Sequence, residues 1–196
     1  MNIQPRRLKM KKLFFTCATI GLLFAGAVQA ENYAGLGYGA SWNGGHAWTD
    51  GRKSDYDTFS GIFSLFAGKV IPTDYFDLRV EGEYLHLNLK PEHGKSRRFR
   101  GLMANATGII PDTGWWAEPY VGLGLGYARW DHNNTIAGQV IGGFEKYFEL
   151  PEWANNTAMA AAVEYKHLWV NENGGKRNNA SKMNSDTVMF KLKYLF

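Results

Sequence analysis

Cysteine is nearly absent from this chain of 196 residues, which contains only one, Cys17. It lies among the first thirty residues, and the pattern of those residues predicts that they are removed on export. The mature chain is then expected to contain no cysteine. Disulfide bonds, thiolate catalysis and cysteine-ligated metal sites are therefore excluded.

Residues 1–30 predict a cleavable signal peptide. Met10-Lys11-Lys12 gives a positively charged start, residues 13–27 form a short apolar segment, and Val28-Gln29-Ala30 is a small-residue cleavage site. Both Met1 and Met10 are compatible with translation starts. The chain is thus expected to consist of a signal peptide, 1–30, and one domain, 31–196.

An excess of charge of one sign is also lacking. The signal peptide contains five of the 22 lysine and arginine residues and no acidic residue, which leaves 17 basic against 18 acidic side chains in the mature domain. This near balance argues against a nucleic-acid partner, which needs a strongly basic surface. After residue 30 there is no run of 18 apolar residues, so no transmembrane helix is expected.

The sequence is instead rich in aromatic residues (15%) and glycine (23 residues), and it alternates with a period of two. The alternation is plainest in residues 77–84, where charged and mostly apolar positions take turns. Similar segments occur at 32–42, 58–70, 99–110, 119–129, 136–148, 159–169 and 188–196. They predict an all-β fold, an eight-stranded antiparallel up-and-down transmembrane β-barrel. The segment 58–70 is the least regular, because Ile62 and Phe66 fall on the side assigned to the lumen.

The cost of placing charge in lipid, about 2–4 kcal/mol for a basic side chain at the bilayer midplane, decides which face points inward. The predicted lumenal charge network consists of Arg79, Glu81, Glu83, Glu164, Lys166 and Lys191. Eight strands leave an interior that side chains can fill, so a large pore is not expected. Alternate glycines at 35–39 and 122–126 are interpreted as room for side chains from opposite strands.

Connections and tryptophans predict the orientation in the membrane. Outer loops are predicted at 43–57, 90–98, 131–135 and 171–181, and periplasmic turns at 72–74, 111–114 and 149–156. Six tryptophans fall at strand ends and predict two aromatic girdles at the membrane interfaces. The outer girdle comprises Trp42, Trp130 and Trp169, and the inner one Trp115, Trp116 and Trp153.

Three segments carry a resemblance to a known family. Residues 58–88, residues 118–129 and Val163-Glu164-Tyr165 resemble the second and third, the fifth and the seventh strands of OmpA-like, opacity-type outer-membrane β-barrels. The resemblance implies a protein of the bacterial outer membrane, in a family of structural anchors, adhesins, serum-resistance proteins and narrow channels. It also implies that Tyr194 and Phe196 form the signal read by the barrel-assembly machinery. No peptidoglycan-binding domain follows Phe196, so the barrel alone is expected.

An enzyme is the first alternative, because some eight-stranded barrels modify lipid A. The pattern expected of such a deacylase is His-x-Ser-Asn with a nearby glutamate. The serine is missing from this position after both His86 and His167. Ser41 and His86 remain as a pair, but they come from strands that are not neighbours. Histidine spacing predicts no metal site. We therefore expect no catalytic residue and no cofactor, and keep a narrow ion channel as the second alternative.

The second outer loop carries the one functional indication. This loop contains four basic residues and one acidic residue, Glu92. The basic residues are Lys90, Lys95, Arg97 and Arg98. A basic loop above outer-membrane lipid could bind lipopolysaccharide or an anionic host or surface glycan. Simple headgroup contact that anchors the barrel is the alternative. The working hypothesis is a non-enzymatic outer-membrane barrel with a role in surface structure, adhesion or host contact.

Overall fold

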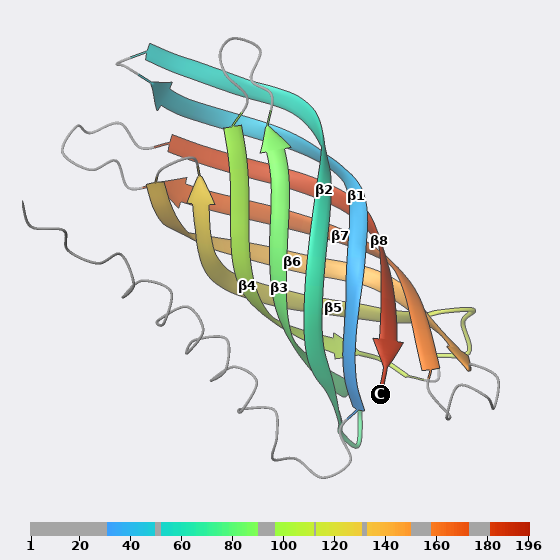
Figure 1. Cartoon of the computed structure of the whole chain (residues 1–196). Helices are drawn as coiled ribbons and strands as arrows, with labels where there is room; N and C mark the ends of the chain where they lie inside the picture. Colours follow the sequence, from blue (N-terminus) through green and yellow to red (C-terminus); the bar gives the residue numbers. More distant parts are fainter. Residues whose placement is uncertain are drawn as a thin grey trace, which may run out of the picture. The chain divides into compact units, whose positions relative to one another are not determined.

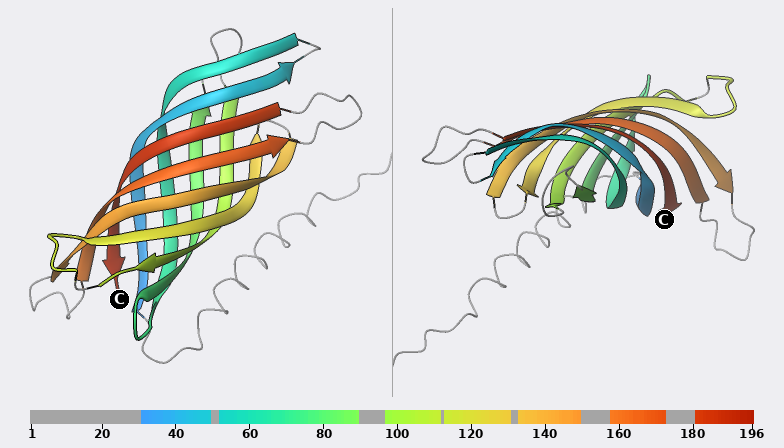
Figure 2. Two further views of the ribbon diagram at one scale, coloured as in Figure 1. Left: turned by 180° about the vertical axis from the view of Figure 1, so that it is seen from behind. Right: turned by 90° about the horizontal axis from the view of Figure 1, so that it is seen from above.

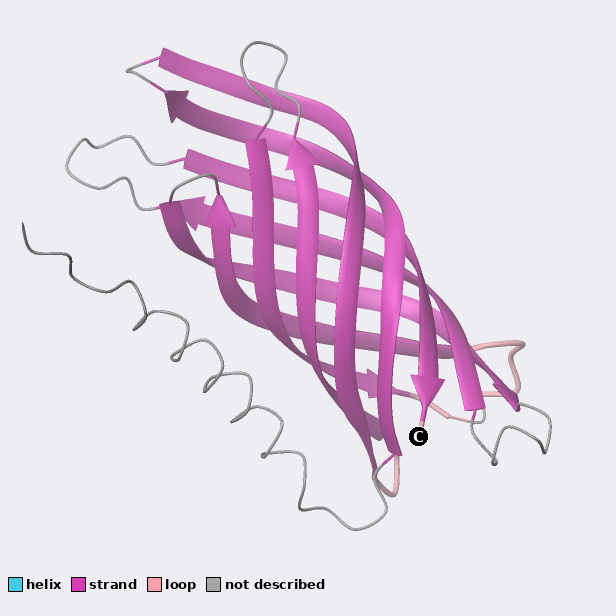
Figure 3. Ribbon diagram, in the orientation of Figure 1, coloured by secondary structure: helices cyan, strands magenta, loops and turns pink. Residues whose placement is uncertain are grey.

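Strands account for all the regular structure that is described (Figure 3). The computed structural model describes residues 31–49, 52–89, 97–111, 113–130, 133–149, 158–172 and 181–196, so the predicted signal peptide lies outside it. The strands are β1 (Glu31–Thr49), β2 (Arg52–Pro72), β3 (Asp77–Leu89), β4 (Arg97–Ile109), β5 (Glu118–Trp130), β6 (Asn133–Glu149), β7 (Ala158–Glu172) and β8 (Ser181–Leu195). Among the described residues, no helix has the length and apolar character needed to cross a membrane.

The eight strands form a closed antiparallel barrel, which confirms the predicted fold class (Figure 1). Each strand pairs with the next, and β8 returns to pair with β1. At this seam the backbone groups of Asn32 and Phe196 exchange two hydrogen bonds, of 3.2 and 2.9 Å. Closure removes the sheet edges wherever all eight strands pair, which a β-structure surrounded by lipid requires.

Side chains alternate between lumen and outside along every strand. In β5, the outward-facing Val121, Leu123 and Leu125 are 64–70% exposed, while the residues between them are glycines. A monomer in water does not expose an apolar surface of this extent. The outward band therefore needs lipid around it, as predicted. It includes Leu36, Tyr38, Phe63, Leu65, Leu102, Tyr127, Val140, Phe144, Val163, Val188 and Phe190.

The alternation inverts toward the end of the barrel away from the termini. In the first half of β3, Arg79, Glu81 and Glu83 are buried in the lumen. Farther along the same face Leu85 and Leu87 are buried, while His86 and Asn88 face outward. On β3 the outer part of the wall therefore resembles a soluble protein, apolar inside and polar outside. The inversion marks where the wall leaves the hydrocarbon.

In the second segment the inversion accounts for Ile62, whereas Phe66 packs against Lys191 nearer the periplasm. Ile62 and Phe66 point into the lumen and are only 2% and 4% exposed. Ile62 belongs to an apolar cluster inside the inverted part of the barrel. Its other members are Leu85, Leu87, Phe99, Met103, Ala128, Ala137, Leu168, Val170, Met183 and Met189.

The end of the barrel at which β1 begins and β8 ends is assigned to the periplasm. Turns at residues 73–76 and 110–117 connect strands at this end. Short periplasmic turns are the rule for barrels of this kind. At the opposite, outer end, β1 and β2 extend beyond the other strands, as two further views also show (Figure 2).

The prediction of a long outer loop at 43–57 is wrong. β1 continues to Thr49, β2 begins at Arg52, and the two remain paired throughout. The β2–β3 pairing, in contrast, ends at Ile62 and Leu87. The polar residues of this stretch indicated a loop, but outside lipid a paired strand accepts polar residues on both faces.

Alternate glycines make room inside the barrel, but mainly for neighbouring strands and not for the opposite wall as predicted. A Cβ atom on Gly124 would lie 2.2 Å from Oδ1 of Asn105 on β4 and 2.8 Å from Cγ of Gln139 on β6. One on Gly35 would lie 2.6 Å from the ring of Phe66 on β2. In a narrow barrel the inward side chains of adjacent strands converge, so glycine gives its neighbours the space they need.

Candidate functional site

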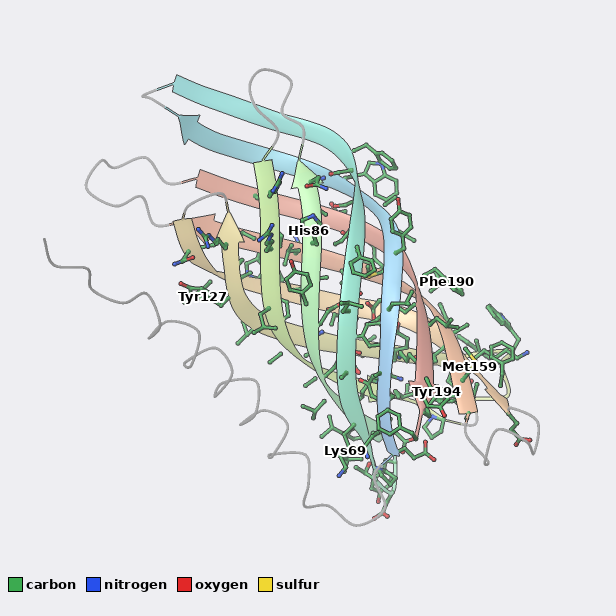
Figure 4. All side chains as sticks on the ribbon, viewed as in Figure 1. Lys69, His86, Tyr127, Met159, Phe190 and Tyr194 are labelled. Atoms are coloured by element: carbon green, nitrogen blue, oxygen red, sulfur yellow. The ribbon has the colours of Figure 1, made fainter. Side chains whose placement is uncertain are left out.

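A layer of ionised side chains fills the part of the lumen nearer the periplasm. All six residues of the predicted network are there, each no more than 4% exposed: Arg79, Glu81, Glu83, Glu164, Lys166 and Lys191. Alternation in β3, β7 and β8 directs them inward, and closure of the barrel brings the three strands together around one space. Figure 4 shows side chains on both faces of the wall.

Lys191 on β8 is a central cation of this layer. Its Nζ lies 3.0 Å from Oε1 of Glu81 and 3.4 Å from Oε1 of Glu164. The same ammonium lies 3.9 Å from the centroid of the Phe66 ring. One lysine therefore neutralises carboxylates from two other strands and packs on an aromatic face.

Glu83 is held from several strands. Lys166 of β7 donates to Oε1 of Glu83 and also lies 3.1 Å from Glu164. The amides of Asn105 and Gln139 donate to Oε2 of Glu83 at 2.9 and 3.3 Å. Glu81 and Glu83, which could be read as an acid pair, are thus bound into a charge-compensated network.

Sequence reasoning missed two members, Glu145 on β6 and Lys193 on β8. Arg79 donates to Oε1 of Glu145 at 2.6 Å, and Lys193 donates to Oε2 of the same carboxylate. With these two residues, four carboxylates face four cations. Lys193 shares the face of Lys191, a signal that was available. Glu145 follows Ile141 and Gly143 on its face, so alternation there gave little indication.

Uncharged polar residues and the apolar cluster lie side by side on the outer side of the charged layer. The Oγ atoms of Ser41 and Ser185 are 2.5 Å apart, and the Nδ2 of Asn43 donates to Ser60 at 2.6 Å. Ser41 is therefore inward and buried, whereas His86 faces outward. The structure thus agrees with the argument against a Ser41–His86 pair, since the wall separates the two side chains.

Two rows of outward-facing side chains mark the outer end of the wall, each linked by strand pairing. His86, Arg100, Arg129 and Asn134 follow one another across β3, β4, β5 and β6; we call them the basic row. Phe59, Trp42, Asp186 and His167 follow one another across β2, β1, β8 and β7; we call them the aromatic–acidic row. His86 lies near the outer end of β3 (Figure 4).

The aromatic–acidic row contains a histidine–aspartate pair. Nδ1 of His167 lies 2.8 Å from Oδ1 of Asp186, and the hydroxyl of Tyr165 donates to the same oxygen at 2.5 Å. The ring of Trp169 lies 6.2 Å from that of His167. The position two residues beyond His167, where the deacylase pattern has serine, is thus held by a tryptophan. This arrangement can orient an imidazole, but its hydroxyl group comes from a tyrosine.

The described tryptophans of the predicted girdles lie at the two ends of the barrel, as their assignment to an outer and an inner girdle requires. Trp42 is 52% exposed on the outer wall, where its ring packs edge-on against Phe59 at 5.4 Å. Trp169 is half-buried. Trp115 and Trp116 are 65% and 74% exposed beside the periplasmic turn. Trp153 and the side chain of Trp130 lie outside the described residues.

The other predicted residues are only partly described. Arg98 is exposed on the outer part of β4, and the backbone of Arg97 belongs to the same strand. Lys90 and Lys95 lie outside the described residues. Tyr194 and Phe196 are both exposed, and their rings stack at 6.0 Å beside the seam. Within the described parts of the chain, no three His, Cys, Asp or Glu side chains form a group that could hold a metal ion.

Comparison with known proteins gives the fold. No family model matches the chain, and no curated protein matches it. Among solved structures, it is similar to the outer membrane enzyme PagL, with a TM-score of 0.53, 12% identity and coverage of 81% of this chain and 97% of that one. It is also similar to Neisserial surface protein A (NspA), with a TM-score of 0.51, 16% identity and coverage of 85% and 98%. The chain therefore has the fold of eight-stranded outer-membrane β-barrels, and its lipid-requiring outer band agrees with a location in the bacterial outer membrane.

Proposed function

We propose that this protein is a non-enzymatic outer-membrane barrel of the OmpA-like type, whose outer end makes contacts at the cell surface. The observation that carries the proposal is the β1–β2 hairpin. The ten β2 residues from Arg52 to Gly61 pair with β1 but lie beyond the end of the β2–β3 pairing. At the rise of an extended strand they span about 30 Å. A paired, polar projection of this length is suited to contact outside the membrane.

The filled interior supports a role at the surface over one in conduction. Charged side chains fill the lumen nearer the periplasm, and the apolar cluster, in which Leu85, Leu87 and Phe99 are fully buried, shares the outer part with uncharged polar side chains. An ion crossing this outer part would lose its hydration and gain few polar partners in return. The proposed barrel therefore does not conduct.

Anionic glycans are the proposed class of ligand, through the predicted basic loop between β3 and β4. Replacing Lys95, Arg97 and Arg98 together with glutamine is expected to weaken binding of the nanodisc-embedded barrel to heparin by about tenfold, since each exposed ion pair contributes up to about 1 kcal/mol. Binding is measured by surface plasmon resonance at physiological salt.

Lys146→Gln is the matched control, because Lys146 is an exposed outward lysine at the periplasmic end of β6. It should bind heparin as the wild type does. Equal binding by the triple variant and the wild type would refute the glycan proposal.

A lipid A-modifying activity is the second candidate, favoured by the His167–Asp186 pair on the outer wall. In such a reaction Nε2 of His167 would take a proton from water as the water attacks an acyl ester, and the proton would then pass to the leaving alkoxide. We expect instead that lipid A from cells with and without the gene gives the same acyl pattern in mass spectrometry. A gene-dependent loss of an acyl chain that His167→Ala abolishes would establish the enzyme.

A further inference from the structure

A groove opens on the outer wall where β2 and β3 separate. It has a volume of about 340 Å³, and its outward lining consists of Tyr38, Phe59, Gly61, Phe63, His86 and Asn88. Gly61 is the first β2 residue beyond the β2–β3 pairing, which ends at Ile62 and Leu87. The groove therefore exists because the two strands part at this point of the wall.

Gly61 keeps the groove open. It is outward and exposed, and a Cβ atom there would lie 3.2 Å from the hydroxyl of Tyr38. Phe59 and Phe63 flank it on the same face and are 63% and 37% exposed. Aromatic walls around a floor without a side chain offer an apolar chain a matching concave surface.

The groove adjoins the basic row. His86 belongs to both, and in register with it follow Arg100 on β4 and Arg129 on β5. Arg100 and Arg129 are directly opposite each other and exposed on the outer wall. Two arginines at opposed positions of adjacent strands, whose backbones lie roughly 5 Å apart across the sheet, provide donors that can bind one phosphate together.

We propose that this groove and the basic row form one binding site for a phosphorylated glycolipid of the lipopolysaccharide class. An acyl chain lies in the groove over Gly61, a phosphate lies between Arg100 and Arg129, and His86 and Asn88 face the sugar between them. Charge complementarity selects this occupant, since a basic row that follows directly on an apolar groove matches a lipid whose anionic headgroup follows on its chains. The site lies at the base of the β1–β2 hairpin, since Phe59 and Gly61 belong to both, and it is distinct from the basic loop of the proposed function.

The test is native mass spectrometry of the full-length mature barrel, titrated in zwitterionic detergent with bisphosphorylated lipid A. Arg100→Gln with Arg129→Gln is expected to weaken binding by roughly tenfold for each arginine, as for hydrogen bonds to charged groups. Dephosphorylated lipid A should bind the wild type as weakly as lipid A binds the double variant. Gly61→Leu, which fills the groove, should also weaken binding of lipid A.

Controls separate the site from general effects. Gly82→Leu places the same side chain at another outward glycine, whose Cβ would meet only the carbonyl oxygen of Ala67 at 3.9 Å, and it should leave binding unchanged. Heat-modifiable mobility on a gel verifies that every variant forms a closed barrel. Wild-type affinity in the double arginine variant, or phosphatidylglycerol binding as tightly as lipid A, would overturn the proposal.

Discussion

Lys191→Met is expected to destabilise the barrel by about 3–5 kcal/mol, because it leaves buried carboxylates without their shared cation. In the folded protein the Lys191 ammonium lies 3.0 Å from Glu81 and 3.4 Å from Glu164, and it is 1% exposed. Methionine has a similar length but no charge. Packing against Phe66 is therefore retained, while Glu81 and Glu164 lose the positive charge that they share. Urea unfolding in detergent micelles, followed by tryptophan fluorescence, measures the change in the free energy of unfolding.

A second substitution distinguishes charge from packing. Glu81→Gln added to Lys191→Met removes one of the uncompensated carboxylates and should restore part of the lost stability. Lys146→Met, on the exposed face of β6, should change stability by no more than about 0.5 kcal/mol. If Lys191→Met unfolds at the urea concentration of the wild type, the charged layer does not stabilise the fold as described.

Deletion of Phe196 is expected to abolish most membrane insertion while export continues. The backbone of Phe196 exchanges two hydrogen bonds with Asn32 at the seam, and its exposed ring stacks on Tyr194. Deletion therefore removes the last pair of the ladder that closes the barrel, together with the terminal aromatic ring. We propose that the barrel-assembly machinery reads this ring. Insertion is measured as heat-modifiable protein in the outer-membrane fraction, and export as cleavage of the predicted signal peptide.

Two further variants separate recognition from closure. Phe196→Ala retains the backbone groups and removes only the ring, so a recognition role predicts that it inserts as poorly as the deletion. Phe148→Ala removes an equally outward ring, 47% exposed, at the periplasmic end of β6 and should insert normally. Normal insertion of the deletion variant would contradict both roles of Phe196.

The sequence was sufficient to predict the fold, because lipid enforces a strict alternation that few other environments impose. Residues 77–84 show this, since each of Arg79, Glu81 and Glu83 would be costly in hydrocarbon and each is buried in the lumen. The prediction was weakest where the wall leaves lipid, because polar and not apolar side chains are favoured on the outer face there. At Leu85 and Leu87 the apolar residues change to the lumenal face. An analysis that assigns apolar residues to the lipid face along the whole strand cannot predict that change.

The site could be predicted less completely than the fold. Glu145 has no patterned neighbours on its face, so only the closed barrel brings it to Arg79 and Lys193. The His167–Asp186 pair and the groove at Gly61 depend on strand register, which alternation does not give. The two ends of each contact are separated in sequence, and only the pairing of strands determines which positions become neighbours.

The apolar cluster at the outer end has a consequence for how the molecule responds to salt. Together with the cluster of Tyr33, Phe66, Val70, Ala160 and Leu195 near the periplasmic end, it encloses the ionised layer between two water-poor barriers. Counterions weaken attraction between charges only where they can approach them. The attraction between the buried charges should therefore be nearly independent of ionic strength. Interactions of the arginines on the outer wall should instead weaken as the salt concentration of the surrounding medium rises.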